Sequence, residues 1–360
     1  MVLELTLISE KLKIAEARIV ALTVREFFLN HSCPSVSCGV LVGIYKRNRR
    51  GLLRNKVLTP LLRIIHSCCN YSDDVAEFRI GRHDVYMGAC RELANYFDKV
   101  GIEYAVIKTV RDFPADIADI DMLVKPSHLP ISRRALKDLG YRLRKISEGQ
   151  ELWSRVIDNV VVDVELHSMV SVAGFTYIES DVIFRNLTRK MGVLVPKDWL
   201  SVLIASAHAI IKDLEIRLSD MLELAFYLSK NGSSRTTLRN PIIDYASSLG
   251  LRRALEYMTM LTGSLIPMDP RNMLDTNERK RYVTGLPKSL PVKPPITIIL
   301  STLIEKALNK ALLNGPRKVL DELLSILKTK GADAITAYLT GQAVTKDVFE
   351  DMIRKGDASD

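Results

Sequence analysis

The chain has 360 residues, 47% of them hydrophobic, and carries 51 Lys and Arg against 42 Asp and Glu, a formal charge of +9 at pH 7. This length exceeds the commonest domain size of about 100–150 residues, so we expect two or three packed units with a large core. The basic balance favours a polyanionic partner such as a nucleic acid or a nucleoside triphosphate.

The N-terminus does not predict a secretory signal, because Glu4, Glu10 and Lys11 interrupt the apolar region that a signal needs. The longest apolar runs, at 38–45 and 296–304, are shorter than the roughly 20 residues that cross a bilayer. We therefore expect a cytoplasmic protein with no membrane partner.

The cysteines are odd in number and lack the paired spacing of a zinc site; they are Cys33, Cys38, Cys68, Cys69 and Cys90. His31, Cys33 and Cys38 contain the residue types of a metal site, but a second half-site is missing. Because a chain of this size does not need disulfides for stability, free or buried thiols are the favoured interpretation.

Residues 1–85 are expected to form a helical N-terminal extension. Apolar residues recur at helical spacing from Leu3 to Leu29, which predicts an amphipathic helix. The densest basic run, KRNRRGLLRNK at 46–56, allows two interpretations: a patch that contacts phosphates, or a solvated turn between helices.

Residues 86–195 are expected to form a small mixed sheet with helices on one side, which is the α+β fold class. Helical periodicity over 86–99 ends before Gly101, a typical helix stop. The pattern then predicts strands and one helix, in the order strand 103–108, strand 119–124, helix 130–140, strand 141–146 and strand 156–166 with a turn at Asp158-Asn159.

From residue 196 to 360 the period is helical, which predicts a mostly α-helical C-terminal domain. The segment 196–228 is too long for one average helix, so we expect two helices joined near Leu214. Six prolines in 263–295 predict a long connection. Short helices are expected to close the chain at 297–313, 316–329 and 332–339.

The stretch FPADIADIDMLV, residues 113–124, places two carboxylates at the mouth of a buried strand. Because a strand alternates its side chains, Asp119 and Asp121 face the same way. Carboxylates this close repel one another unless a cation lies between them. Magnesium, with manganese as the alternative, binds such oxygen ligands together with substrate phosphates. Asp116 is out of phase with the pair, and we interpret it as a loop or capping residue.

The strand at VVDVELHSM alternates in the same way, with Asp163, Glu165 and His167 on one face. A half-exposed antiparallel sheet also alternates apolar and polar residues, but cross-strand charge balance would favour Lys or Thr opposite the acids. His167 is interpreted either as a general base or as a hydrogen-bonded structural histidine. His208 lies in an apolar helical stretch and is interpreted as a satisfied core or interface histidine rather than a ligand.

These motifs, in this order, resemble the polymerase-β-type nucleotidyltransferases. The resemblance is closer to the poorly characterised archaeal and bacterial members, in which a strand ending in Lys-Gly or Lys-Thr precedes a loop, a DID strand, a helix ending in Gly-Tyr and an acidic strand ending in Leu-His. It covers about residues 88–230. The matching positions are Lys108-Thr109, Phe113-Pro114, Asp119-Ile120-Asp121, Gly140-Tyr141 and Glu165-Leu166-His167.

The resemblance implies transfer of a nucleoside monophosphate from a nucleoside triphosphate to an acceptor. It implies that Asp119, Asp121 and Glu165 hold a divalent metal, because an in-line displacement at phosphorus needs clustered carboxylates. The third acid of such sites serves as a metal ligand or accepts the acceptor's proton. Glu165 is favoured for this position and Asp163 is the alternative.

The resemblance also implies a phosphate-binding loop that begins at Lys108 and Thr109, with Arg111 as a further candidate. The broad signature has Gly-Gly or Gly-Ser where this chain has Lys108-Thr109. Close approach of the backbone to the phosphates is therefore not secured by glycine.

Two classes of function stay open: a nucleotidyltransferase, and a catalytically silent module that binds nucleotide or nucleic acid. The retained acids favour the first and the missing glycines favour the second, while a phosphohydrolase is a weaker third because only His167 is placed as a histidine ligand. The acceptor is open among RNA, a protein side chain and a small molecule. Basic runs at 46–56, 133–145 and 279–281 favour RNA. The sequence predicts neither the preferred nucleotide nor the oligomeric state.

Overall fold

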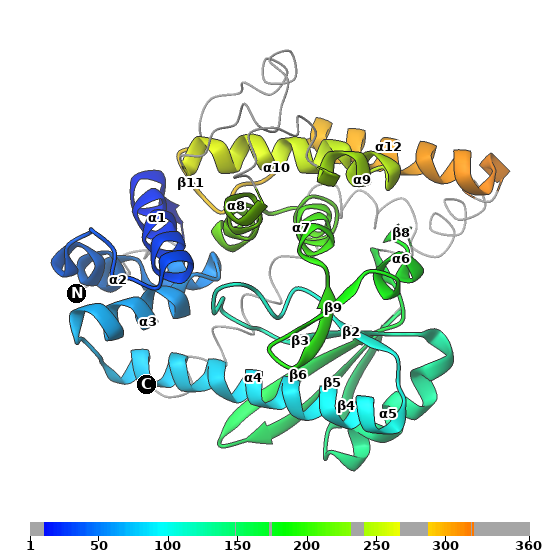
Figure 1. The fold of residues 1–360 in the computed structure, drawn as a ribbon, viewed down its shortest axis with the longest axis horizontal. Coiled ribbons are helices and arrows are strands. Elements are labelled where there is room, and N and C mark those ends of the chain that lie inside the picture. Colours follow the sequence, from blue (N-terminus) through cyan, green and yellow to red (C-terminus); the bar gives the residue numbers. More distant parts are fainter. Residues whose placement is uncertain are drawn as a thin grey trace, which may run out of the picture.

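The computed structural model describes residues 11–147, 149–172, 175–231, 241–266, 287–317 and 319. Helices surround a mixed sheet, so the predicted α+β class is confirmed. Figure 1 shows helix α4 along one side of the sheet and helices α7, α8, α10 and α12 on the opposite side.

The central sheet has five strands in the order β2-β3-β6-β5-β4. Its strands are β2 (Tyr104–Val106), β3 (Ile120–Val124), β4 (Arg142–Ser147), β5 (Gln150–Ile157) and β6 (Val160–His167). Strands β3 and β6 run parallel, and the other pairs run antiparallel. In the parallel register Asp121 lies opposite Glu165, so the two acidic strands are direct neighbours.

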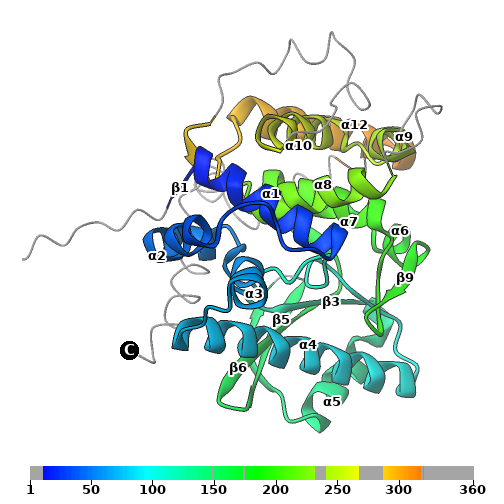
Figure 2. The same ribbon diagram turned by 60° about the vertical axis from the view of Figure 1, so that its left-hand side comes forward.

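Helices α4 (Asp74–Val100) and α5 (Leu129–Asp138) cover one face of this sheet (Figure 2). The side chains that meet them are the apolar half of each alternating strand, such as Met122 and Val164, which are fully buried. The acids therefore stand on the other face, as the strand period predicted.

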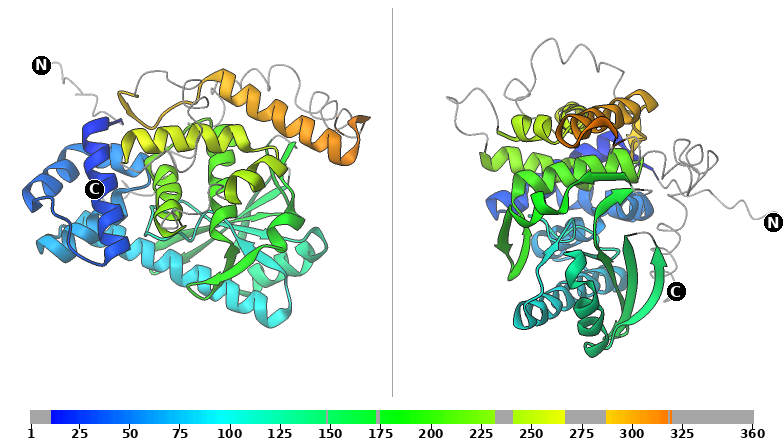
Figure 3. Two further views of the ribbon diagram at one scale, coloured as in Figure 1. Left: turned by 45° about the horizontal axis from the view of Figure 1, so that its top comes forward. Right: turned by 90° about the vertical axis from the view of Figure 1, so that its right-hand side faces the viewer.

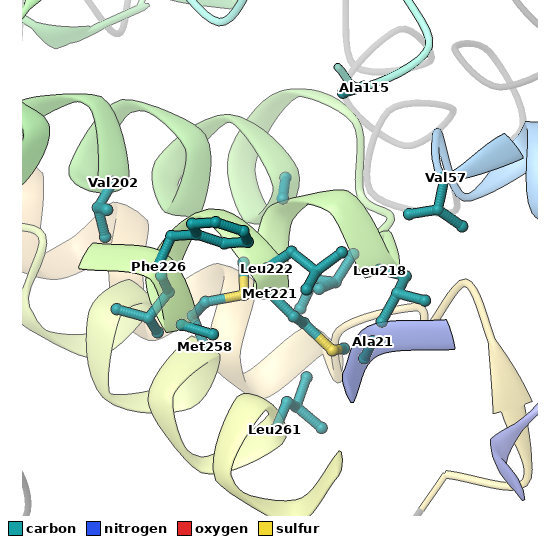
Figure 4. Close-up of a cluster of buried hydrophobic side chains, with 14 of the residues drawn as sticks. Ala21, Val57, Ala115, Val202, Leu218, Met221, Leu222, Phe226, Met258 and Leu261 are labelled. Atoms are coloured by element: carbon teal, nitrogen blue, oxygen red, sulfur yellow. The ribbon is translucent and has the colours of Figure 1, made fainter. Parts of the chain in front are cut away.

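The N-terminal helices are α1 (Ile14–Asn30), α2 (Cys38–Arg54) and α3 (Leu58–Cys69). They share a core with the C-terminal helices α7 (Asp198–Ala207), α8 (Leu218–Asn231), α9 (Pro241–Ser248), α10 (Arg252–Leu265) and α12 (Ile296–Asn314). Figure 4 shows Ala21 of α1 close to Leu218 and Met221 of α8, with Leu261 of α10 beside them. The first and last described parts of the chain thus pack as one layer, seen edge-on in Figure 3.

Short elements connect these layers. They are β1 (Leu12–Lys13) paired with β11 (Ser289–Leu290), the 3₁₀ turn η1 (Pro126–His128), β7 (Val170–Val172) paired with β8 (Phe175–Ile178), α6 (Ser180–Phe184), β9 (Leu187–Lys190) paired with β10 (Val193–Pro196), and the π-helical turn η2 (His208–Lys212).

Several predicted elements are confirmed with small shifts of their limits. The turn at Asp158-Asn159 separates β5 from β6, and both residues have positive φ. The break near Leu214 is also confirmed: α7 and the π-helical turn end before it, and Leu214 itself has a φ of 52°. The expected connection at 263–295 falls largely outside the described residues, as do the helices expected at 316–329 and 332–339.

Two helices differ from their predicted limits. The first described helix begins at Ile14 because Leu12 and Lys13 pair as a strand with β11, and residues 3–10 of the expected helix lie outside the described residues. Helix α4 begins at Asp74 rather than at residue 86, since Asp73 caps it by accepting a hydrogen bond from the amide of Ala76. Strand β5 was missed.

Buried charged residues explain the missed parts of α4 and β5. Arg79, Arg82 and His83 are buried in the first turns of α4, so the apolar period is absent there. In β5 the inward position before Trp153 is Glu151, which is buried in an ion pair with Arg133. The expected domain limit at residue 85 falls within α4.

The prediction of free thiols was wrong for four of the five cysteines. Disulfides join Cys33 to Cys68 and Cys38 to Cys69, while Cys90 is a buried free thiol. The prediction weighed the size of the chain, whereas the pairing follows from tertiary contact: the loop after α1 and the start of α2 lie against the end of α3. Such bonds are typical of oxidising compartments and of intracellular proteins from hyperthermophiles.

Within the described residues, every helix is too short or too polar to span a bilayer.

Candidate functional site

A cleft of about 250 Å³ lies between the acidic face of the sheet and the helical layer. Three parts of the chain line it: the strands β3 and β6 with the loop before β3, the corner between α2 and α3, and the segment from α7 to the start of α8. The residues that line it are mostly charged. Those used below are Arg54, Lys56, Lys108, Thr109, Arg111, Asp116, Asp119, Asp121, Glu165, His208, Lys212, Asp213, Glu215, Arg217 and Asp220.

Asp121, Glu165 and His167 form the tightest cluster, with one ligand atom of each within 4.8 Å of the others. His167 Nε2 lies 3.0 Å from Asp121 Oδ1 and 3.3 Å from Glu165 Oε2. Burial opposes the charge of His167, but its bonds to the two carboxylates raise its pKa. A general base and a hydrogen-bonded structural histidine would both lie in this position. The hydrogen bonds to Asp121 and Glu165 support the structural interpretation.

Asp119 lies directly before β3 and is half-buried. Burial, and then the neighbouring Asp121 and Glu165, raise the pKa of its carboxyl. Within the described residues its side chain makes no hydrogen bond or ion pair. Asp119 is therefore a carboxylate held among like charges and left available for a ligand.

Lys108 occupies the position of the signature's first glycine and has a φ of 61°, the left-handed conformation that glycine adopts most readily. The backbone thus takes the glycine-like turn without glycine. Its Nζ lies 3.1 Å from Asp121 Oδ2 and 3.2 Å from His208 Nε2. Although burial opposes it, Lys108 together with His167 holds the pKa of Asp121 well below its usual range.

Thr109 uses its hydroxyl within the loop. Its Oγ1 accepts a hydrogen bond from the amide of Asp121 at 3.0 Å and donates to the carbonyl of Ile107 at 3.3 Å. The side chain is therefore occupied in fixing the loop to the acidic strand.

Arg111 also lines the cleft, but its guanidinium is committed to the protein. It donates to the carbonyls of Lys108 and Ser219 and forms ion pairs with Asp220 and Glu223, both at 3.3 Å. These contacts fasten the loop to the start of α8.

Asp163, the alternative third acid, does not line the cleft. It is buried, and its Oδ1 accepts a hydrogen bond from the Ser154 hydroxyl at 2.6 Å. The cleft thus holds Glu165 and leaves Asp163 behind it, which favours Glu165 as the third acid.

Asp116 is a capping residue, as interpreted from the sequence. Its carboxylate accepts hydrogen bonds from the amides of Leu58 and Thr59 and from the Thr59 hydroxyl, at 2.7, 3.2 and 2.6 Å. It therefore caps the N-terminus of α3 and joins the acidic loop to the N-terminal helices.

Residues 115–267 match the family described as uncharacterised nucleotidyltransferase. The match covers Asp119, Asp121 and Glu165 and the helices α7 to α10, and it supports a nucleotidyltransferase family for this part of the chain. It leaves out Lys108 and the N-terminal helices. No curated protein and no solved structure matches the chain.

The cleft also contains residues that sequence reasoning did not assign to the site. His208 is satisfied, as predicted, since Nδ1 lies 2.9 Å from the Tyr177 hydroxyl and Nε2 lies 3.0 Å from Asp213. Burial lowers its pKa to about 4, so the ring is neutral at pH 7. The prediction placed His208 in a core or an interface, and the structure places it at the cleft wall beside Lys108.

Lys56, Lys212 and Arg217 form a basic wall opposite the acids. Of these three residues, only Lys56 belongs to the basic run 46–56 that the sequence marked as a possible phosphate-contacting patch. Most of that run is part of α2, where Arg47 and Arg49 pair with Glu16 and Asp73 away from the cleft. No period or motif marks Lys212 or Arg217.

The donor set fits a divalent metal. Asp119, Asp121 and Glu165 supply the carboxylate oxygens that Mg²⁺ and Mn²⁺ bind, and the raised pKa of Asp119 reports uncompensated negative charge. The imidazole of His167 would suit Mn²⁺ better than Mg²⁺. A metal at Asp121 would have to displace the contacts that Lys108 and His167 make with this carboxylate.

Proposed function

We propose that the protein is a metal-dependent nucleotidyltransferase that moves a nucleoside monophosphate from a nucleoside triphosphate to an acceptor. The observation that carries this proposal is the convergence of Asp119, Asp121 and Glu165 on one cleft, with Asp119 lacking a protein partner among the described residues. The match of residues 115–267 supports the same class of reaction.

In the proposed reaction an acceptor oxygen attacks the α-phosphorus and forms a new P–O bond. The bond from the α-phosphorus to the bridging oxygen breaks, and pyrophosphate leaves with that electron pair. The acceptor's proton passes to Glu165, the carboxylate at the cleft whose partner is His167. Asp119 and Asp121, with Glu165 beside them, would hold a Mg²⁺ or Mn²⁺ ion, which would offset the negative charge that develops in this displacement.

The neutral state of His208 matters for the same reaction. An uncharged ring beside the Lys108 ammonium adds no repulsion and lets Lys108 stay charged. If a metal binds the carboxylates, the Lys108 ammonium can exchange its ion pair with Asp121 for one with a phosphate.

RNA is the acceptor that the surface charge favours. The edge strand β4 is exposed along its whole length and carries Arg142, Arg144 and Lys145. A row of exposed cations on a sheet edge suits the backbone of a nucleic acid. The run at 279–281 lies outside the described residues.

A silent nucleotide-binding module is the second candidate. Lys108 and His167 already neutralise Asp121 without any metal, which is the arrangement expected of a site that has lost its reaction. This candidate predicts nucleotide binding without transfer.

Label transfer separates the two candidates. The wild type is incubated with Mg²⁺ or Mn²⁺ and each α-labelled nucleoside triphosphate, with and without cellular RNA, and covalent label is followed. We expect transfer that falls at least about 10³-fold in Asp119→Asn and Asp121→Asn, because each change removes a metal ligand. Asp158→Asn is the matched control, since Asp158 is exposed in a turn that Asn also adopts.

Binding without transfer under every condition would favour the silent module. Neither binding nor transfer by the wild type would contradict both candidates.

A further inference from the structure

The cations that line the cleft divide into two groups. Four of them are neutralised by carboxylates of the protein: Arg54 by Glu215, Lys108 by Asp121, Arg111 by Asp220 and Arg217 by Asp213. The other two are Lys56 and Lys212, whose side chains make no hydrogen bond or ion pair within the described part of the chain.

Lys56 is held in place by the residues before it. Arg54 makes a two-oxygen ion pair with Glu215, and the Asn55 side chain accepts a hydrogen bond from the amide of Leu218. The carbonyl of Lys56 accepts a hydrogen bond from the amide of Asp116. The corner between α2 and α3 is therefore fixed to both the acidic loop and the start of α8.

The backbone of Lys56 adopts an unusual conformation for a lysine. Its φ is 55°, in the left-handed region where a residue with a side chain costs roughly 1–2 kcal/mol and where glycine or asparagine is favoured. The backbone conformation therefore does not explain a lysine at position 56. We relate it to the side chain, whose half-buried ammonium lines the cleft. Burial and Arg217 lower its pKa, whereas Asp119 raises it, so the group faces the unpartnered carboxylate across the cleft.

Lys212 ends the π-helical turn η2, an irregularity that occurs often at functional sites. It lines the cleft, and its charge is felt by Asp121, Glu165 and His167, so Lys212 faces these residues while Lys56 faces Asp119. It forms no ion pair at 4.0 Å or closer with the described residues. The space between ammonium and carboxylates is open to a ligand.

The charges left over after internal pairing are of both signs: Asp119 on one wall, and Lys56 and Lys212 on the other. A ligand that satisfies all of them must carry a cation and several negative charges. A metal complex of a triphosphate has this composition, whereas a free metal ion or a simple anion satisfies only one wall.

We propose that Lys56 and Lys212 bind the triphosphate tail of the nucleotide, opposite the metal-holding acids, and that the loop residues Thr109 and Arg111 do not. The proposal rests on the proposed function and assigns its phosphate subsite. It also makes the N-terminal helices part of the active site, because Lys56 lies outside the region that matches the nucleotidyltransferase family.

Calorimetric titration tests the assignment. Mg²⁺–tripolyphosphate and each of the four Mg²⁺–nucleoside triphosphates are titrated into the wild type, Lys56→Met, Lys212→Met and the double variant. Each single change should weaken binding by about tenfold or more, since each removes one charge-assisted contact. Tripolyphosphate and nucleotides should lose the same factor, because the contact is with phosphate.

Two variants serve as controls. Lys99→Met removes an exposed lysine at the end of α4 and should leave binding unchanged. Lys56→Arg keeps the charge and should retain most of the affinity that Lys56→Met loses. Thermal unfolding without ligand should show no loss of stability in Lys56→Met, because the ammonium that it removes has no protein partner.

The outcomes separate this assignment from the proposed function. If the wild type binds none of the probes, both fail. If the wild type binds and Asp119→Asn does not, while Lys56→Met and Lys212→Met bind like the wild type, the proposed function stands and the phosphate assignment is overturned. Equal losses in Lys56→Arg and Lys56→Met would also overturn it, since a role in packing would then explain them.

Discussion

The acidic wall of the cleft stands on neighbouring strands, whereas the basic wall is assembled from a helix corner and an irregular turn. Asp121 and Glu165 face each other in the parallel register of β3 and β6. Lys56 and Lys212 come from positions far apart in the chain, and both follow the end of a helix. The two walls therefore depend on different kinds of constraint: strand alternation for the acids, tertiary contacts for the cations.

This difference shows how the site divides its work. A metal needs ligands held at short, fixed distances, and adjacent strands provide them. A flexible polyphosphate tolerates longer side chains as point charges, which lysines provide. The contacts that connect the two walls stabilise the fold. The following variants test which cations bind phosphate and which residues only hold the walls together.

Arg111 should be needed for folding rather than for phosphate binding. Arg111→Met leaves Asp220 and Glu223 without their guanidinium partner, and breaking a buried ion pair costs about 3–5 kcal/mol. Burial already raises the pKa of Glu223 to about 7, so part of this cost is relieved by protonation as the pH falls below 7. Urea unfolding at pH 8 and pH 6 measures both effects.

Arg189→Met is the matched control, because Arg189 pairs with Asp98 at an exposed site. An exposed ion pair contributes little to stability, so this variant should unfold near the wild-type midpoint. If Arg111→Met is as stable as the wild type but binds triphosphate more weakly, Arg111 contacts phosphate and its structural role is contradicted.

The two disulfides should stabilise the helices that carry Lys56. Each closes a loop of more than thirty residues, and a bond of this kind contributes about 2–4 kcal/mol. The paired change of Cys33 and Cys68 to Ser removes one bond and should lower the free energy of unfolding by this amount. Reduction breaks both bonds and should have up to about twice the effect. Urea unfolding with and without a reductant measures it.

Cys90→Ala serves as the control for that experiment, since Cys90 is a free thiol in the other core. It should respond to reductant like the wild type. Identical unfolding of oxidised and reduced protein would show that the bonds do not hold this part of the fold.

Asp116 should connect the two walls. Asp116→Ala removes the cap of α3, at a cost of about 1–2 kcal/mol, and frees the corner that positions Lys56. Nucleotide affinity should fall along with stability. Asp73→Ala removes the cap of α4, so it should cost similar stability and leave the affinity unchanged. If Asp116→Ala and Asp73→Ala bind nucleotide equally well, Asp116 does not position Lys56 for nucleotide binding.

The sequence predicted the acidic wall well because its signal is local. Asp119, Asp121 and Glu165 follow the alternation of strands whose other side is apolar. This alternation is a property of the strand itself and does not depend on tertiary packing. The order of elements from residue 103 to 166 was predictable for the same reason, although β5 was missed because Glu151 is buried where an apolar residue is expected. The break between two helices near Leu214 was predicted as well, whereas β7 to β10 and α6, between residues 170 and 196, were not.

The basic wall could not be predicted because its residues carry no period. Lys56 was one of many cations in a basic run, and only the bonds of Arg54, Asn55 and Lys56 to three distant elements single it out. The functions expected of Thr109 and Arg111 followed from their place in a motif, and their partners became visible only in the fold. The cysteine pairing was likewise a matter of tertiary contact.

The central claim is that the cleft binds a metal and a triphosphate together. Titration of Mn²⁺, followed by its electron paramagnetic resonance signal with and without a non-hydrolysable nucleoside triphosphate, tests it most directly. We predict that the nucleotide tightens Mn²⁺ binding and that Mn²⁺ tightens nucleotide binding by the same factor, since coupling between two ligands is reciprocal. Asp121→Asn should abolish this coupling. Nucleotide binding that is equally tight in a metal chelator, with no effect on Mn²⁺, would contradict the account.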